Sequence, residues 1–224
     1  MSLFVGCPVP TNPLISKSFF KPYKIIIACI FPKNVYNSVM PNYHRFKIEG
    51  AYYFFTVVTY KRRSLFTDDN TITVLKNAFQ QVKSDRPFEM SAVCLLPDHL
   101  HCIWKMSHMD SDYSTRWSII KRIFSKTYVK TSCVKLNQTR SRQKKRELPI
   151  FQRRFWEHYI RNEYDYWKHV HYIHYNPYRH GLVKHIADWP YSTYHRFCRE
   201  GYYKNFDWSK LQKDITKNQF HFYE

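Results

Sequence analysis

The stretch that decides the fold spans residues 88–106 and reads FEMSAVCLLPDHLHCIWKM. It is apolar and strand-like as far as residue 96, a Pro-Asp pair interrupts it, and alternation resumes at His99. Two such runs joined by a short turn predict a β-hairpin. Because residues i and i+2 of a strand point to the same face, His99 and His101 lie side by side, with Leu100 and Cys102 on the opposite, core-facing side.

Paired imidazoles on one strand supply half of a divalent-metal site, which needs one or two further nitrogen or oxygen ligands. The alternative is a histidine pair that is exposed or hydrogen-bonded, because the chain has twelve histidines and the pattern H-x-H arises by chance. The motif alone favours this second interpretation. Its place directly after a turn in an apolar hairpin adds weight to the first.

Apolar periodicity outside the hairpin predicts five further elements. They are a buried strand at 52–60, a helix opened by Asp68/Asp69 and closed before Pro87, a helix capped by Ser114, a strand at 151–161, and a helix at 163–176 that is capped by Asn162 and ends at Pro177. The order of these elements predicts an α+β fold of the ferredoxin-like (split βαβ) type, an antiparallel sheet with helices on one face.

Helical spacing also predicts which side chains of the first two helices face the core. They are Ile72, Leu75, Ala78, Phe79 and Val82 in the first helix, and Trp117, Ile120, Phe124 and Tyr128 in the second.

The last helix carries a second set of reactive side chains. His169, Tyr172 and Asn176 stand at i, i+3 and i+7, so one helix face presents an imidazole, a phenol and an amide. A phenol has an ordinary pKa of about 10 and attacks at neutral pH only with help from a base or a metal-polarised target. Asn176 is placed to offer its amide oxygen to a metal held by the histidine pair. The chain has 19 tyrosines, and the pattern leaves Tyr175 and Tyr178 open as alternatives.

The charge balance indicates a polyanionic partner. The chain has 36 Lys and Arg against 17 Asp and Glu, a formal net charge of +19, and 19% of its residues are aromatic. Nucleic acid is therefore favoured over a membrane surface. Thirteen of the basic residues lie in 116–154, where Glu147 is the only acid. The residues predicted to contact DNA phosphates are Lys61, Arg62, Arg63, Arg116, Lys121, Arg122, Arg153 and Arg154.

Four glycines without a G-x-G, and no P-loop pattern, argue against a nucleotide cofactor. The six cysteines form no C-x-x-C pair, and the apolar run 25–31 is far shorter than the roughly 20 residues of a membrane span. We therefore expect a cytoplasmic protein with no membrane segment. The expected organisation is one domain at 40–208, with a basic loop or insertion at 131–150, and a tail at 209–224. The first 39 residues, 1–39, are expected to be an N-terminal extension, either a mobile appendage or translation from a start upstream of the true one at Met40.

Several blocks together resemble the REP-associated tyrosine transposases, relatives of the single-tyrosine HUH insertion-sequence transposases. The blocks, which run in order from about residue 40 to about residue 208, are MPNYHR (40–45), YFFTVVTYKRR (53–63), LPDHLHCIW (96–104), QRRFWEH (152–158), IRN (160–162), HVHYIHYNP (169–177), HGLV (180–183) and DWPYST (188–193). The chain departs from the family pattern at His171, where the family usually has Asp, and at Tyr178, where it usually has Val. His171 is expected to change the local charge next to Tyr172.

The resemblance implies an HUH-type, metal-dependent endonuclease and strand transferase for single-stranded, hairpin-forming repeat DNA. It places the nucleophile at Tyr172, which forms a covalent 5′-phosphotyrosine, and the metal ligands at His99, His101 and Asn176, with His169 as an auxiliary residue. The implied metal is Mg²⁺ or Mn²⁺. The implied assembly is a monomer or a homodimer.

Three other classes of protein share some of these features. An RNA-binding module of the same strand order should show a glycine-containing RNP pattern, which is absent here. A replication initiator or relaxase usually has a longer chain with a helicase domain. An inactive, domesticated transposase would share the same residues, so sequence alone does not separate it from an active enzyme.

Overall fold

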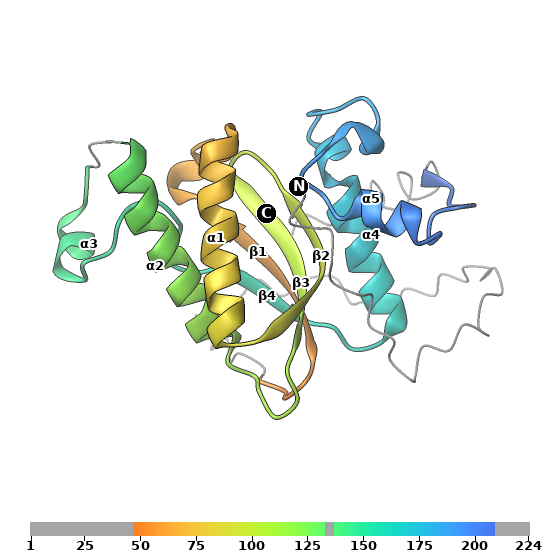
Figure 1. Cartoon of the computed structure of the whole chain (residues 1–224), viewed down its shortest axis with the longest axis horizontal. Helices are drawn as coiled ribbons and strands as arrows, with labels where there is room; N and C mark the ends of the chain where they lie inside the picture. Colours follow the sequence, from red (N-terminus) through yellow and green to blue (C-terminus); the bar gives the residue numbers. More distant parts are fainter. Residues whose placement is uncertain (1–46, 133–136, 209–224) are drawn as a thin grey trace, which may run out of the picture. The chain divides into compact units, whose positions relative to one another are not determined.

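Four strands form one sheet (Figure 1), and the first of them consists of aromatic and β-branched residues, YYFFTVV. The computed structural model describes residues 47–132 and 137–208. The expected extension at 1–39 and the expected tail at 209–224 therefore lie outside the described residues. The strands are β1 (Tyr52–Val58), β2 (Phe88–Leu95), β3 (His99–Met106) and β4 (Trp156–Tyr159).

Five α-helices accompany the described part of the sheet. They are α1 (Asp69–Asp85), α2 (Tyr113–Ser132), α3 (Arg140–Lys144), α4 (Glu163–Arg179) and α5 (Tyr194–Arg199). Short 3₁₀ turns at Tyr60–Arg62 and Ile186–Asp188 complete the regular structure.

The strands lie in the order β2-β3-β1-β4, and all neighbouring pairs are antiparallel. β1 and β2 therefore run parallel to each other with β3 inserted between them, and β3 and β4 flank β1 in the same way. This is the split βαβ arrangement, and the predicted fold class is confirmed.

The helices α1 and α2 cover one face of the sheet. Tyr53, Phe55 and Val57 alternate along β1 toward this side and are fully buried. Trp104 of β3 stacks on Trp117 of α2, with ring centroids 4.3 Å apart and planes 15° apart. This face is a closed aromatic and aliphatic core.

The opposite face is covered by α4 and α5, as Figure 1 shows. Phe54 and Ile103 point to this side and pack in a second core with Tyr172 and Ile173 of α4. The expectation of helices on one face holds for α1 and α2 only. The continuous apolar run of β1 is consistent with burial on both faces, and α4 covers the second one.

Two helix ends differ from the sequence-based expectation. The helix α4 does not end at Pro177 but continues to Arg179. Pro177 lies in the last turn, where its missing N–H removes a single hydrogen bond. The end is closed by the His180 N–H, which donates to the Asn176 carbonyl at 3.0 Å. The helix α2 is capped by Asp112, whose carboxylate accepts from the Thr115 N–H at 3.2 Å, and Ser114 lies inside the first turn.

The expected strand at 151–161 is shorter in the structure. Only Trp156–Tyr159 pairs with β1, and Phe151 forms an isolated bridge with Thr59. The stretch expected to be a basic loop or insertion contains the end of α2 and the short helix α3. The side chain of Arg142 in α3 is buried, where it donates to the carbonyls of Leu148 and Phe151.

Candidate active site

The two histidines of β3 face α4 from the interior of the protein. Their side chains are buried, and their ring centroids are 4.8 Å apart at an angle of 83°. Strand alternation explains why both point to this face, while Leu100 and Cys102 point into the core beneath α1 and α2. The side-by-side placement expected from H-x-H is therefore observed. The alternative of an exposed pair is excluded, because both side chains are buried, whereas the alternative of a hydrogen-bonded pair is not.

Each imidazole uses its Nδ1 atom in a hydrogen bond within the fold. His99 Nδ1 lies 2.5 Å from Asp98 Oδ1, and His101 Nδ1 lies 2.9 Å from the hydroxyl of Thr56. Thr56 reaches His101 because the β1–β3 register places the two residues opposite each other. An Nδ1–H that donates to oxygen leaves the lone pair on Nε2, which is the form that binds metals.

The Nε2 atoms of both histidines are buried and have no hydrogen-bond partner among the described residues. Burial lowers the pKa of His101 well below its ordinary value, and the positive charges of neighbouring groups add to this effect. A neutral imidazole with a buried, unpaired nitrogen is a ready metal ligand.

Tyr172 of α4 lies against this pair. Its ring centroid is 5.1 Å from that of His101, and its side chain is 1% exposed. Arg179, two turns later on α4, donates from Nη1 to the Tyr172 hydroxyl at 3.4 Å. The two alternative tyrosines lie elsewhere, since Tyr175 packs on Tyr178 and stacks on Trp208. The pattern left these tyrosines open, and Tyr172 is the one whose ring contacts His101.

Asn176 lies between two helix residues that touch the histidine pair. Tyr172, one turn before it, contacts His101, and His180, one turn after it, has its ring 5.3 Å from that of His99. Residues four apart lie on the same face of a helix, so Asn176 faces the pair as well. Both polar atoms of its amide are buried without a hydrogen-bond partner among the described residues.

The unpaired atoms form a donor set that suits a divalent cation. A buried polar atom without a partner costs free energy, so three residues in this state at one place indicate a site that can bind a ligand. Two imidazole nitrogens and one amide oxygen match Mn²⁺ better than Mg²⁺ by ligand preference. His99, His101 and Asn176 therefore fit a metal on the evidence of this structure.

Asp98 connects the histidine pair to the surface. It accepts from His99 and forms an ion pair with Arg62 Nη1 at 3.1 Å. Burial raises the pKa of Asp98, but the hydrogen bonds and charges of His99 and Arg62 outweigh it and leave the pKa below its usual range. Lys61 and Arg62 both have positive φ angles, 58° and 49°, which are rare for residues other than glycine and are often found at functional sites.

A second group of ligand-type side chains joins β4 to α4. The carboxylate of Asp165 lies 2.8 Å from His158 Nε2, and His169 Nδ1 lies 2.7 Å from the Asp165 carbonyl. The ligand atoms of His158, Asp165 and His169 all lie within 4.8 Å of one another, so this group could also hold a metal ion. His169 belongs to this group, and the ring of Phe54 lies 4.8 Å from its ring and 5.6 Å from that of His101.

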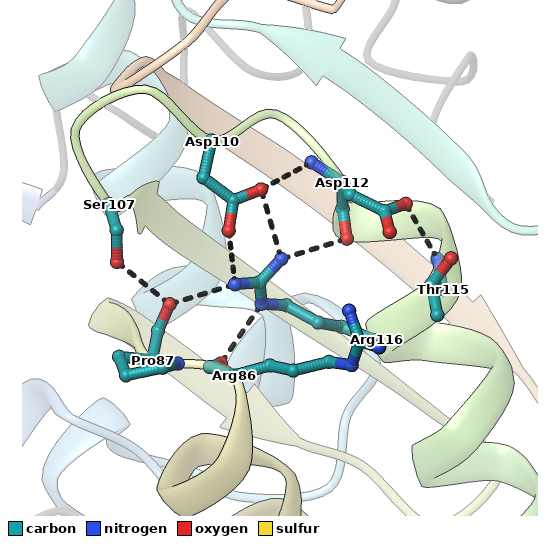
Figure 2. A network of polar contacts seen from close by, with 7 residues as sticks. All are labelled: Arg86, Pro87, Ser107, Asp110, Asp112, Thr115 and Arg116. Carbon is teal, nitrogen blue, oxygen red and sulfur yellow. Dashed lines mark hydrogen bonds and ion pairs between the residues drawn. The ribbon is translucent and has the colours of Figure 1, made fainter.

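Arg116 is not the surface residue that the charge pattern predicts. Its side chain is buried, and its guanidinium donates to the carbonyls of Arg86, Pro87 and Asp112 at 3.0 Å each (Figure 2). The same group forms two hydrogen bonds with the Asp110 carboxylate, at 3.2 and 2.5 Å. Arg116 ties α2 to the turns at the sheet edge, and we remove it from the candidate DNA contacts.

The other predicted DNA contacts divide by exposure. Lys61, Arg62, Arg122, Arg153 and Arg154 are exposed. Arg153 pairs with Glu147 at 2.5 Å, which reduces its free charge. The half-buried ones are engaged inside the fold: Lys121 donates to the Gln152 carbonyl at 2.9 Å, and Arg63 donates to the carbonyls of Tyr60 and Pro149.

His171, where the chain departs from the family pattern, does not add charge beside Tyr172. Its ring packs on Phe206 at 4.2 Å and on Trp167 at 5.8 Å. Burial lowers its pKa to about 4, so the side chain is neutral near pH 7. Where the family usually has an aspartate, a neutral histidine removes one negative charge, so the expected change in local charge next to Tyr172 stays a prediction.

Four residues of the site were not assigned a role from the sequence: Thr56, Asp98, Arg179 and His180. Arg179 carries a weak signal, because it stands at i+7 from Tyr172 on the same helix. Thr56 carries none, since only the strand register brings it to His101.

Comparisons with known proteins identify the family of this chain. The family described as "Transposase IS200 like" matches residues 47–176. A "REP-associated tyrosine transposase" of Escherichia coli K12 is 42% identical over 180 residues, covering 80% of this chain and 98% of that protein. A relative from Haemophilus influenzae with a similar description is 40% identical, covering 79% of this chain and all of that protein.

Among solved structures, one described as "Structure of the REP associates tyrosine transposase bound to a REP hairpin" matches with a TM-score of 0.60. It is 42% identical and covers 72% of this chain and 87% of that chain. Fold and site together define a DNA-cleaving transposase. The chain belongs to the IS200-like transposase family, and within it to the REP-associated tyrosine transposases.

No helix in the described ranges is both long and apolar enough to cross a membrane.

Proposed function

We propose that the protein cuts and rejoins single-stranded, hairpin-forming repeat DNA through a covalent 5′-phosphotyrosine, with a divalent metal as cofactor. The observation that carries this proposal is the buried ring of Tyr172 against His101, beside two imidazoles whose Nε2 atoms are unpaired among the described residues. A phenol beside a metal-type donor set is the arrangement that transesterification of a phosphodiester requires.

Tyr172 supplies the nucleophile. Its Oη forms a bond to the scissile phosphorus, and the bond from phosphorus to the 3′ oxygen breaks. The phenol loses its proton, and the departing 3′ oxygen gains one. The phosphoester energy is retained in the protein–DNA bond, so a 3′-hydroxyl reverses the step and joins strands without a nucleotide cofactor.

His99 Nε2, His101 Nε2 and the Asn176 amide oxygen would hold the metal. When bound, Mn²⁺ or Mg²⁺ supplies Lewis-acid polarisation of the scissile phosphate and offsets its developing negative charge. The chain prepares these ligands through Asp98 and Thr56, which orient the two rings from their Nδ1 sides.

The exposed basic residues Lys61, Arg62, Arg122, Arg153 and Arg154 are the proposed contacts to the DNA backbone, with smaller contributions from Arg63 and Lys121. Such contacts supply affinity and salt dependence but little sequence information. The hairpin preference is proposed from the related structure described as bound to a REP hairpin. We infer action as a monomer or a homodimer.

The test is a covalent-adduct assay. Labelled single-stranded oligonucleotides, each with one hairpin repeat from the DNA that flanks the gene, are incubated with the protein and Mn²⁺ and resolved under denaturing conditions. The wild type should form a protein–DNA adduct and release a 3′-hydroxyl fragment. Tyr172→Phe should form none, whereas Tyr175→Phe should behave as the wild type.

An adduct with Tyr172→Phe would contradict the assignment of the nucleophile. Tight hairpin binding by the wild type without any adduct would favour the second candidate, a transposase fold that binds DNA without cutting it.

A further inference from the structure

The end of α4 brings a guanidinium to the candidate nucleophile. Arg179 is the last residue of the helix and is half buried. Its Nη1 donates to the Tyr172 hydroxyl at 3.4 Å, and its Cζ lies 5.9 Å from the centre of the Tyr172 ring. This position exists only because α4 continues past Pro177.

The charge around the histidine pair is strongly positive. Arg62 approaches from the turn after β1 through Asp98, and Arg179 approaches from α4. Asp98 is the carboxylate in direct contact with the pair. Such a site is built to receive an anion.

The chemistry of the proposed step gives Arg179 a second partner. Once Tyr172 Oη has bonded to phosphorus, the non-bridging phosphate oxygens are two bonds away from Oη. A planar guanidinium has several N–H donors in a fixed fork, so one group can hold Oη and a phosphate oxygen together. The Arg179 guanidinium, which donates to the Tyr172 hydroxyl, is therefore within reach of the negative charge that develops on the scissile phosphate.

We propose that Arg179 is a catalytic residue, which holds the Tyr172 hydroxyl before attack and binds the scissile phosphate during and after it. This inference rests on the proposed function. In the step, the Oη–phosphorus bond forms and the bond to the 3′ oxygen breaks with its electron pair on that oxygen. The phenol proton leaves and the 3′ oxygen takes up a proton. Arg179 keeps its protons throughout and is regenerated unchanged when the strand is rejoined.

The competing explanation is purely structural, because an arginine in the last turn of a helix stabilises the helix dipole. Arg199 provides the matched control, since it is an exposed arginine at the last position of α5. Arg179→Gln and Arg199→Gln remove the same charge from the same kind of position. Arg179→Lys keeps the charge and loses the fork.

The experiment measures the single-turnover rate of adduct formation with the hairpin oligonucleotides and Mn²⁺, beside hairpin affinity and thermal unfolding. Arg179→Gln should form the adduct about 100-fold more slowly than wild type, by analogy with loss of one charge-stabilising donor. Its hairpin affinity should stay within about threefold, because one phosphate contact contributes little to the total. Arg179→Lys should recover part of the rate, and Arg199→Gln should match the wild type.

A second substrate separates charge stabilisation from structure. An oligonucleotide with a methylphosphonate at the scissile position carries no charge on that phosphate. If Arg179 neutralises this charge, the gap between wild type and Arg179→Gln should shrink at least tenfold on the neutral substrate. An unchanged gap, or an adduct rate for Arg179→Gln within threefold of wild type on normal DNA, would overturn the inference.

The two proposals fail in different ways. If the wild type forms no adduct, the proposed function fails and the role of Arg179 falls with it. If the wild type forms an adduct and Tyr172→Phe does not, the function stands, and the Arg179 variants alone decide the inference.

Discussion

The two faces of β3 are built from alternate residues of one strand and have opposite character. Toward α1 and α2 it presents Leu100, Cys102 and Trp104, which pack in a dry core. Toward α4 it presents His99 and His101, whose Nε2 atoms are unpaired among the described residues. Stability therefore comes mainly from the first face. The second face contributes less, because its buried imidazole nitrogens are left unpaired and available to bind a ligand.

The largest expected loss of stability comes from a substitution in the core beneath α1 and α2. Trp117→Ala removes the ring that stacks on Trp104 and leaves a cavity, so it should cost about 4 kcal/mol in the free energy of unfolding. On the other face, His101→Ala removes a smaller and more polar ring, so it should cost less than half as much. Urea unfolding of both variants measures the difference, and equal losses would contradict the contrast.

The next largest effect concerns metal affinity on the face that carries the histidine pair. Asp98→Asn keeps the shape but weakens the hold on His99, so Mn²⁺ should bind about 10- to 100-fold more weakly. Titration of Mn²⁺, followed by electron paramagnetic resonance of the free ion, measures this affinity. Asp85→Asn, an exposed change at the end of α1, is the control. If both variants bound Mn²⁺ as the wild type does, Asp98 would have no role in the site.

A smaller effect concerns the junction of β4 and α4. Burial alone would raise the pKa of Asp165, but hydrogen bonds from His158, His169 and the Arg161 N–H lower it below its ordinary value. The ionised Asp165 carboxylate therefore contributes its full stabilisation above the pKa of an unfolded aspartate, about 4. This stabilisation is lost as the pH falls from there through the lower pKa of the folded state. Asp165→Asn should cost about 2 kcal/mol at pH 7.

The pH dependence provides the check on Asp165. The difference in unfolding free energy between wild type and Asp165→Asn should shrink below about pH 4, because the aspartate of the unfolded chain then takes up a proton while the folded carboxylate stays ionised. A difference that stayed constant from pH 7 to pH 3 would show that the loss comes from shape rather than from charge.

The smallest effect lies on the helix that supports the first face. The Asp68 carboxylate caps α1 by accepting from the Thr71 N–H at 2.8 Å, so Asp68→Ala should cost about 1 kcal/mol. Asp85→Ala, at the other end of the helix, should cost nothing, because a negative charge there opposes the helix dipole. Thermal unfolding distinguishes them, and equal losses would show that capping is not the cause.

Local patterns were sufficient wherever the physical cause is local. The buried face of α1 agrees with the prediction at Ile72, Leu75, Ala78, Phe79 and Val82, because a helix repeats every 3.6 residues whatever surrounds it. The same holds for the histidine pair, since strand alternation alone puts both rings on one face.

Long-range partners explain the errors. Arg116 belongs to a basic stretch, but carbonyls from the α1–β2 turn and the carboxylate of Asp110 draw it into the interior. A count of charges does not show which of them the fold has already paired. The predicted end of α4 at Pro177 was wrong for a related reason. The effect of a proline on a helix depends on the hydrogen bonds that close the last turn, and those are not visible in the local sequence.

The sequence by itself determined the fold class, the two histidines on one face, and the set of tyrosines from which a nucleophile must come. Only the tertiary structure decided that Tyr172 contacts His101, that Thr56 and Asp98 orient the rings, and that Arg179 reaches the Tyr172 hydroxyl. Periodicity is a property of neighbours along the chain, whereas these contacts depend on strand register and on where a helix ends. The net charge of +19 indicated a polyanionic partner. The fold determines which basic side chains are exposed and can contact that partner.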